Sequence, residues 1–112
     1  MSSWETICKV DEIAPNSGLC ALLGKQQVAV FRVSEDGSEH FYAIDNHDPF
    51  SGANVLSRGI VGSLQDTVVV ASPVYKQHFC LRTGVCLEEN IHLRTWSVRT
   101  RGDLVQLLAQ IH

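Results

Sequence analysis

The chain lacks the segments that mark export or membrane insertion. No apolar run approaches the length needed to cross a bilayer, and the start, Met-Ser-Ser-Trp-Glu-Thr-Ile-Cys, has neither the basic nor the apolar region of a secretory signal. Lys and Arg total 9 against 12 Asp and Glu, and the net charge is -3. The basic residues are scattered, which gives no electrostatic footprint for nucleic acid. These absences predict a cytoplasmic protein that binds neither membranes nor nucleic acids.

The sequence also lacks the short motifs of common catalytic chemistry. It has no strand followed by a glycine-rich loop and Gly-Lys-Ser/Thr for phosphate binding, and no Gly-x-Ser-x-Gly for a hydrolase nucleophile. The tripeptide Arg101-Gly102-Asp103 matches a cell-adhesion motif, but a glycine-containing β-turn explains it. We therefore expect no catalytic residues in this chain.

Four cysteines are present, but not at metal-binding spacings: Cys8, Cys20, Cys80 and Cys86. No two of them are two to four residues apart, as zinc sites require, and without an export signal the thiols are expected to stay free. Cys8, Cys20 and Cys80 lie in apolar runs, where cysteine acts as a small hydrophobe. His78 and Cys80 share one face of a strand, but a thiolate nucleophile needs electropositive, partly exposed surroundings. A structural role is favoured for all of them.

What the sequence does contain is a series of short apolar runs separated by Gly, Pro, Asn, Asp and Ser. This pattern is typical of an all-β sandwich or barrel. The expected strands cover residues 4–10, 19–23, 27–33, 39–45, 67–72, 78–81, 93–100 and 104–109. Residues 11–18 are expected to form a connection with room for one helical turn, and residues 46–62 a long irregular loop. At this length we predict a single domain over residues 1–112.

Three segments of the chain resemble the cluster-binding half of a Rieske ferredoxin. They are Tyr42-Ala-Ile-Asp-Asn-His-Asp-Pro-Phe50, Thr67-Val-Val-Val-Ala-Ser-Pro-Val-Tyr75 and His78-Phe-Cys-Leu-Arg-Thr-Gly84. The resemblance implies an antiparallel Rieske-like fold in which two loops carry Cys-x-His and Cys-x-x-His ligand pairs. It also implies that the two loops come together at one tip of the molecule.

The four ligand positions of that family fall on degenerate residues here: Asp48, Phe50, Ser72 and Tyr75. A Rieske centre needs thiolates on one iron and imidazoles on the other. Phe50 has no ligand atom, and the oxygens of Ser72 and Tyr75 suit an iron–sulfur cluster poorly. We therefore expect no metal and no cofactor in this chain, despite the fold.

A narrower resemblance covers essentially the whole chain. Its segments include Trp4-x-x-Ile-Cys-Lys, the Asp-Pro-Phe loop, Val55-Leu-Ser-Arg-Gly59, and Ala71-Ser-Pro73 followed by Lys76-Gln-His-Phe79. Together they are similar to the small subunit of the bacterial assimilatory NAD(P)H-dependent nitrite reductase, a Rieske-fold protein without the cluster ligands. The resemblance implies a partner, the large catalytic subunit, which holds flavin, an iron–sulfur cluster and sirohaem and reduces nitrite to ammonia.

With no redox centre expected, the implied role is non-catalytic: to stabilise the large subunit or dock onto it. The candidate docking residues lie in or beside the two loops: Leu56, Ser57, Arg58, Pro73 and Lys76. Phe50 and Tyr75 either fill the space that a cluster would occupy or form part of the docking patch, because bulky apolar groups require packing. The sequence leaves both outcomes open.

Two alternatives remain at this stage. A Rieske-type two-iron, two-sulfur electron carrier would need unusual ligands, drawn from Cys80, Cys86, His47 and His78. A free-standing β binding module would serve another oxygenase-like or reductase system. Iron content distinguishes the first alternative, and co-purification with a large flavoprotein distinguishes the second. The preferred nicotinamide cofactor, the stoichiometry and the docking face are not determined by the sequence.

Overall fold

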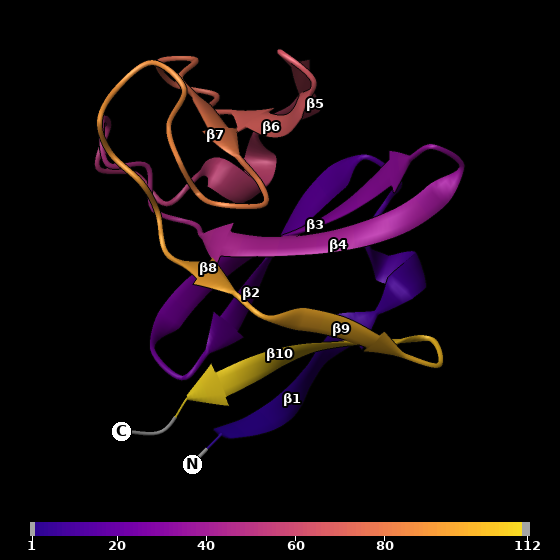
Figure 1. The fold of residues 1–112 in the computed structure, drawn as a ribbon. Coiled ribbons are helices and arrows are strands. Elements are labelled where there is room, and N and C mark those ends of the chain that lie inside the picture. The colour runs from indigo at the N-terminus through magenta and orange to yellow at the C-terminus, as the bar shows by residue number, and fades with distance from the viewer. Residues whose placement is uncertain (1, 111–112) are drawn as a thin grey trace.

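The computed structural model describes residues 2–110 and arranges their strands in three antiparallel sheets (Figure 1). The sheet orders are β1-β10-β9, β2-β3-β4-β8 and β5-β6-β7. The strands are β1 (Ser2–Lys9), β2 (Ser17–Leu23), β3 (Gln26–Glu35), β4 (Ser38–Asp45), β5 (Ile60–Leu64), β6 (Thr67–Ala71), β7 (His78–Cys80), β8 (Thr95–Trp96), β9 (Val98–Arg101) and β10 (Leu104–Gln110). Two short 3-10 helices, η1 (Val10–Glu12) and η2 (Leu56–Arg58), lie between strands. The all-β prediction is confirmed.

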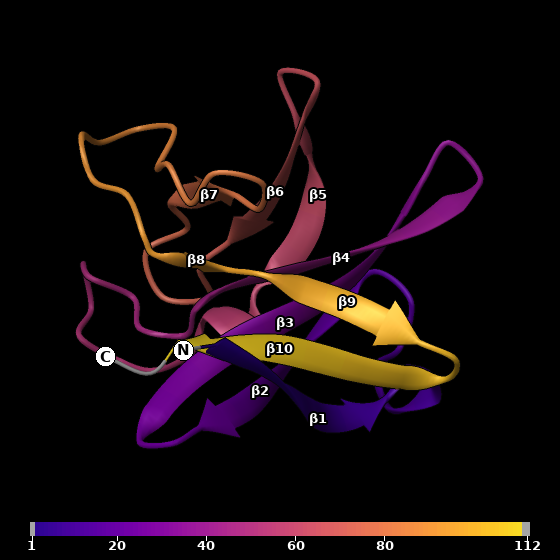
Figure 2. The same ribbon diagram turned by 60° about the horizontal axis from the view of Figure 1, so that its bottom comes forward.

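Strand β3 separates two apolar cores. Its alternate residues Val28 and Val30 pack with Val105 and Leu107 of β10, in the core between the first two sheets. The alternating β3 residues Ala29, Phe31 and Val33 point the other way and belong to the second core, on the side of the small sheet β5-β6-β7. Because successive side chains of a strand point to opposite faces, a strand buried on both faces needs a continuous apolar run. Figure 2 shows the β9–β10 side of the sandwich in front and the β5–β6 hairpin projecting away from it.

The second core joins the small sheet to the sandwich. Phe31 of β3, Val70 of β6 and Phe79 of β7 are fully buried in it. Burying large aromatic side chains supplies much of the stability of such a core. The long connections over residues 46–59 and 81–94 lie around this sheet, at the top of Figure 1. The packing of Phe31 and Phe79 therefore fixes the position of the loops that carry the candidate site.

The structure differs from the predicted elements at two places. Strand β5 was not predicted and overlaps the last three residues of the predicted loop, because Gly62 and Ser63 interrupt its apolar pattern. The predicted strand 93–100 is divided: β8 pairs with β4, whereas β9 pairs with β10. The break falls at Ser97, whose carbonyl oxygen accepts a hydrogen bond from the Leu108 amide at 3.0 Å. Here the chain passes from one sheet of the sandwich to the other.

The four thiols are free, as predicted. Cys8, Cys80 and Cys86 are buried, as expected of a cysteine that acts as a small hydrophobe, whereas Cys20 is exposed. This residue lies on the sheet-edge strand β2, where alternate side chains face away from the core. Neither of the described helices has the length or hydropathy needed to span a bilayer.

Candidate functional site

A buried hydrogen bond joins the loop that follows β4 to the loop that follows β6. The Ser72 hydroxyl donates to Asp48 Oδ2 at 2.5 Å, and both residues are fully buried. The other carboxylate oxygen, Asp48 Oδ1, accepts the Phe50 amide at 2.9 Å. The structure thus brings together one predicted ligand position from each loop, and links them directly through their own side chains.

The Asp48 carboxylate is stabilised in its charged form. Burial by itself raises the pKa of a carboxyl group, but hydrogen bonds from the Ser72 hydroxyl and from the Phe50 and Ser51 amides outweigh burial and lower the pKa of Asp48. The link between the loops is therefore a charge-assisted hydrogen bond at neutral pH. Such bonds are about twice as strong as neutral ones.

The two other predicted ligand positions have different environments. Phe50 packs against the second core, with its ring centroid 6.2 Å from that of Phe79 and the planes tilted by 41°. Tyr75 is 60% exposed. Phe50 therefore fills space beneath the first loop, whereas Tyr75 lies on the surface of the second. Of the two alternatives that the sequence leaves open, filling the space holds for Phe50 and does not hold for the exposed Tyr75.

The four positions do not fit a two-iron, two-sulfur cluster. A Rieske site requires two thiolates and two imidazoles that converge on the irons. Phe50 offers no donor atom, the Asp48 and Ser72 oxygens are bonded to each other, and Tyr75 is exposed. Both the chemistry and the arrangement of these side chains disagree with the cluster that the fold family binds.

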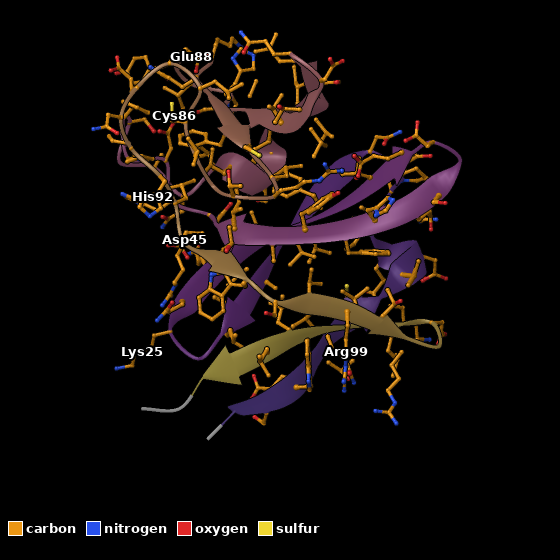
Figure 3. All side chains as sticks on the ribbon, in the orientation of Figure 1. Lys25, Asp45, Cys86, Glu88, His92 and Arg99 are labelled. Atoms are coloured by element: carbon orange, nitrogen blue, oxygen red, sulfur yellow. The ribbon has the colours of Figure 1, made fainter. Side chains whose placement is uncertain are left out.

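The histidines of the alternative ligand set are engaged elsewhere. His47 Nδ1 lies 3.0 Å from Asn54 Oδ1, and His78 Nδ1 lies 2.7 Å from Glu88 Oε2. Figure 3 shows Glu88 and Cys86 in the connection after β7. Within residues 2–110, no group of three or more His, Cys, Asp or Glu side chains is placed to hold a metal ion.

Cys80 also differs from a reactive cysteine in its low solvent exposure. Burial raises the pKa of the Cys80 thiol, but hydrogen bonds from Thr83 and the Arg82 amide outweigh burial and lower it. The residue is only 7% exposed, whereas a reactive cysteine is partly exposed. Its partner in the hypothetical nucleophile pair, His78, is bound by Glu88. This geometry favours the structural role predicted for Cys80.

The candidate docking residues separate into exposed and buried ones. Arg58, Pro73 and Lys76 are exposed, and Ser57 is half-buried. Leu56 is fully buried in the second core, so its prediction as a docking residue is wrong. The single turn of η2 directs Leu56 inward while Arg58, two residues later, remains on the surface. The loop sequence around Leu56 has no regular periodicity, so it did not indicate that this side chain points into the core.

Sequence reasoning missed Asn46, which holds the first loop in place. Asn46 is 1% exposed. Its Nδ2 donates at 3.1 Å to Gln27 Oε1 and to the Asn54 carbonyl, and its Oδ1 accepts the Ser57 amide at 2.7 Å. Asn side chains often bond nearby backbone groups where a strand ends, and that was the available signal. Asn46 ties β3, the loop and η2 together.

Comparison with known proteins places this geometry in a family. Residues 3–108 match the family model described as Rieske-like [2Fe-2S] domain. The chain is 45% identical over 108 residues to the nitrite reductase (NADH) small subunit of Escherichia coli (strain K12), which covers 96% of this chain and 98% of that protein. The NMR structure of the E. coli protein NirD has a TM-score of 0.88 and 44% identity, over 97% of this chain and 98% of that one.

One relative carries the same domain within a larger protein. The nitrite reductase [NAD(P)H] large subunit of Klebsiella oxytoca is 40% identical over 113 aligned residues, which cover 96% of this chain but only 11% of that protein. The full-length matches, in contrast, agree with this chain in length as well as in fold. The chain therefore belongs to the family of nitrite reductase (NADH) small subunits, which is built on the Rieske-like [2Fe-2S] domain.

Proposed function

We propose that this chain is the small, non-catalytic subunit of a cytoplasmic NAD(P)H-dependent nitrite reductase. In this role it stabilises, or docks onto, a large subunit that holds flavin, an iron–sulfur cluster and sirohaem and reduces nitrite to ammonia for nitrate assimilation. The full-length similarity to nitrite reductase (NADH) small subunits supports the assignment. The Klebsiella oxytoca relative supports a large subunit as the partner, since there the homologous domain is part of a protein with that name.

The observation that carries the non-redox part of the proposal is the Asp48–Ser72 hydrogen bond. In a Rieske protein the equivalent positions would hold a thiolate each, and the cluster would join the two loops. Here we propose that the carboxylate and the hydroxyl join them instead. The chain then has no redox centre and takes no part in electron transfer to nitrite.

Co-expression tests the role of the chain in the complex. The large subunit from the same organism should be produced with and without this chain, and its melting temperature, flavin, iron and sirohaem content and NAD(P)H-dependent nitrite turnover measured. We expect the large subunit alone to lose stability, cofactor content or turnover, and the co-expressed chain to restore them. A large subunit with full stability, cofactor content and turnover on its own would contradict the proposed role.

A further inference from the structure

Exposed apolar and cationic side chains gather at the loop end of the small sheet. We call this surface the tip face, and its members are Arg58, Ile60, Pro73, Val74, Tyr75 and Lys76. Ile60 is 71% exposed, Tyr75 60% and Val74 44%. Isolated exposed apolar residues are common, but a group of large ones on one surface marks an interaction site.

Strand pairing and a tight turn place these residues together. Ile60 is paired with Ala71 at the end of β6, directly before Ser72. The backbones approach so closely there that a Cβ on Gly59 would lie 2.4 Å from the Ala71 carbonyl oxygen. The Lys76 amide donates to the Ser72 carbonyl at 3.1 Å, which closes the turn that presents Pro73, Val74 and Tyr75. The apolar residues of both segments therefore lie at the same end of the sheet.

The turn is held in one conformation by Ser72. Its amide donates to the Gln77 carbonyl at 2.9 Å, its hydroxyl accepts the Val74 amide at 3.3 Å, and the same hydroxyl donates to Asp48. Holding a loop in its bound conformation lowers the entropic cost of association. The link between the two loops thus also preorganises the exposed Val74 and Tyr75 side chains.

The charge of the tip face indicates the chemistry of its partner. Arg58 and Lys76 are exposed, and neither takes part in an ion pair among the residues that the structure describes. Of the nearby carboxylates, that of Asp48 is buried, and that of Glu88 is bonded to the amide and the ring of His78. The face is therefore cationic on a chain of net charge -3. Two copies of the chain meeting through this face would oppose like charges, whereas a partner with an acidic rim would be attracted.

We propose that the tip face is the surface that docks onto the large subunit, with Ile60, Val74 and Tyr75 entering an apolar depression rimmed by Asp or Glu. This inference rests on the proposed function and adds the docking face to it. The first and last strands, β1 and β10, pair with each other at the end of the molecule opposite the small sheet (Figure 1). A covalent connection to a larger chain, as in the Klebsiella oxytoca protein, would therefore leave the tip face free.

The test compares tip variants with matched variants at the other end of the molecule. Tyr75→Ala and Ile60→Ser remove apolar contacts, and Leu22→Ser is the control because Leu22 is 68% exposed on β2. Lys76→Glu reverses a charge of the tip face. Its control is Lys25→Glu, since Lys25 lies in the turn after β2, far from the small sheet in Figure 3.

Binding to the cofactor-loaded large subunit should be measured for each variant, at low and high salt. We expect Tyr75→Ala to raise Kd by at least about tenfold, and the Tyr75→Ala, Ile60→Ser double variant by about a hundredfold or more. Lys76→Glu should slow association and weaken its salt dependence. Both controls should stay within about twofold of the wild type. Unfolding free energies that match the wild type would show that the tip variants remain folded.

The outcomes separate this inference from the proposed function. If the wild-type chain binds the large subunit and the folded tip variants bind equally well, the docking face is wrong while the proposed function stands. If the wild-type chain does not bind the large subunit, the proposed function fails as well. If the tip variants abolish self-association in sedimentation experiments but leave large-subunit binding unchanged, the face is an interface between copies and the inference is overturned.

Discussion

The sandwich and the small sheet of this molecule are held together in different ways. In the sandwich, β3 and β4 pair continuously from Val28 opposite Asp45 to Glu35 opposite Ser38. In the small sheet, β6 and β7 pair only from Val69 opposite Cys80 to the end of β6. The short sheet supplements its apolar core with single polar contacts in its loops. Apolar strand runs and long pairing thus define the sandwich, whereas the site depends on individually placed side chains.

The largest loss of stability is expected from a substitution in the second core, where the sandwich and the small sheet pack against each other. Phe79→Ala removes a fully buried ring that packs against Phe50 and should lower the free energy of unfolding by about 3–5 kcal/mol. Urea denaturation measures the loss, with Val85→Ala, at an exposed position, as the control. Hydrogen exchange should rise more in β6 and β7 than in β1 and β10. Equal acceleration in all strands would contradict the comparison, because both regions would then open as one unit.

A smaller effect is expected from the polar link between the loops. Asp48→Ala leaves the Ser72 hydroxyl and the Phe50 amide without their acceptor, and should cost about 1–3 kcal/mol of unfolding free energy. A double-mutant cycle with Ser72→Ala isolates the pair energy. Asp103→Ala, at an exposed carboxylate in the turn before β10, is the matched control and should stay within about 0.5 kcal/mol. A loss at Asp48 no larger than at Asp103 would show that the link does not stabilise the loops.

The smallest effect is a pH dependence of the same link. The pKa of Asp48 is lowered in the folded state, so its contribution is fully present above the unfolded value of about 3.9 and is lost as pH falls through the lower folded value. The difference in unfolding free energy between the wild type and Asp48→Asn should therefore shrink below about pH 4. Denaturation at several pH values between about 7 and 3 measures it. A difference that stays constant or grows on acidification would contradict a stabilised Asp48 carboxylate.

The sandwich could be predicted from the sequence better than the small sheet and its loops. Strands β3, β4, β6 and β10 were predicted because their apolar runs and turn residues repeat on a local scale. Strand β5 was missed, since Gly62 and Ser63 interrupt its pattern and its pairing with β6 is a tertiary property. The strand propensity of a segment contains little information about which other strand it pairs with.

The candidate site was predicted in its positions but not in its contacts. The resemblance to Rieske proteins identified Asp48 and Ser72, yet no sequence pattern indicated that they would bond each other. The burial of Leu56 and Asn46 and the exposure of Ile60 also depend on how η2 and β5 pack against the sheets. Side-chain direction in an irregular loop is determined by tertiary packing, which periodicity does not report.

The most direct test of the central claim is an iron and acid-labile sulfide analysis of the anaerobically purified chain, with its visible absorption spectrum. The claim is that the Asp48–Ser72 bond joins the two loops in place of a cluster. It predicts a colourless, iron-free protein that is nevertheless fully folded. A brown protein with stoichiometric iron and sulfide would contradict it, and its ligands would then have to come from the cysteines and histidines assigned here to structure.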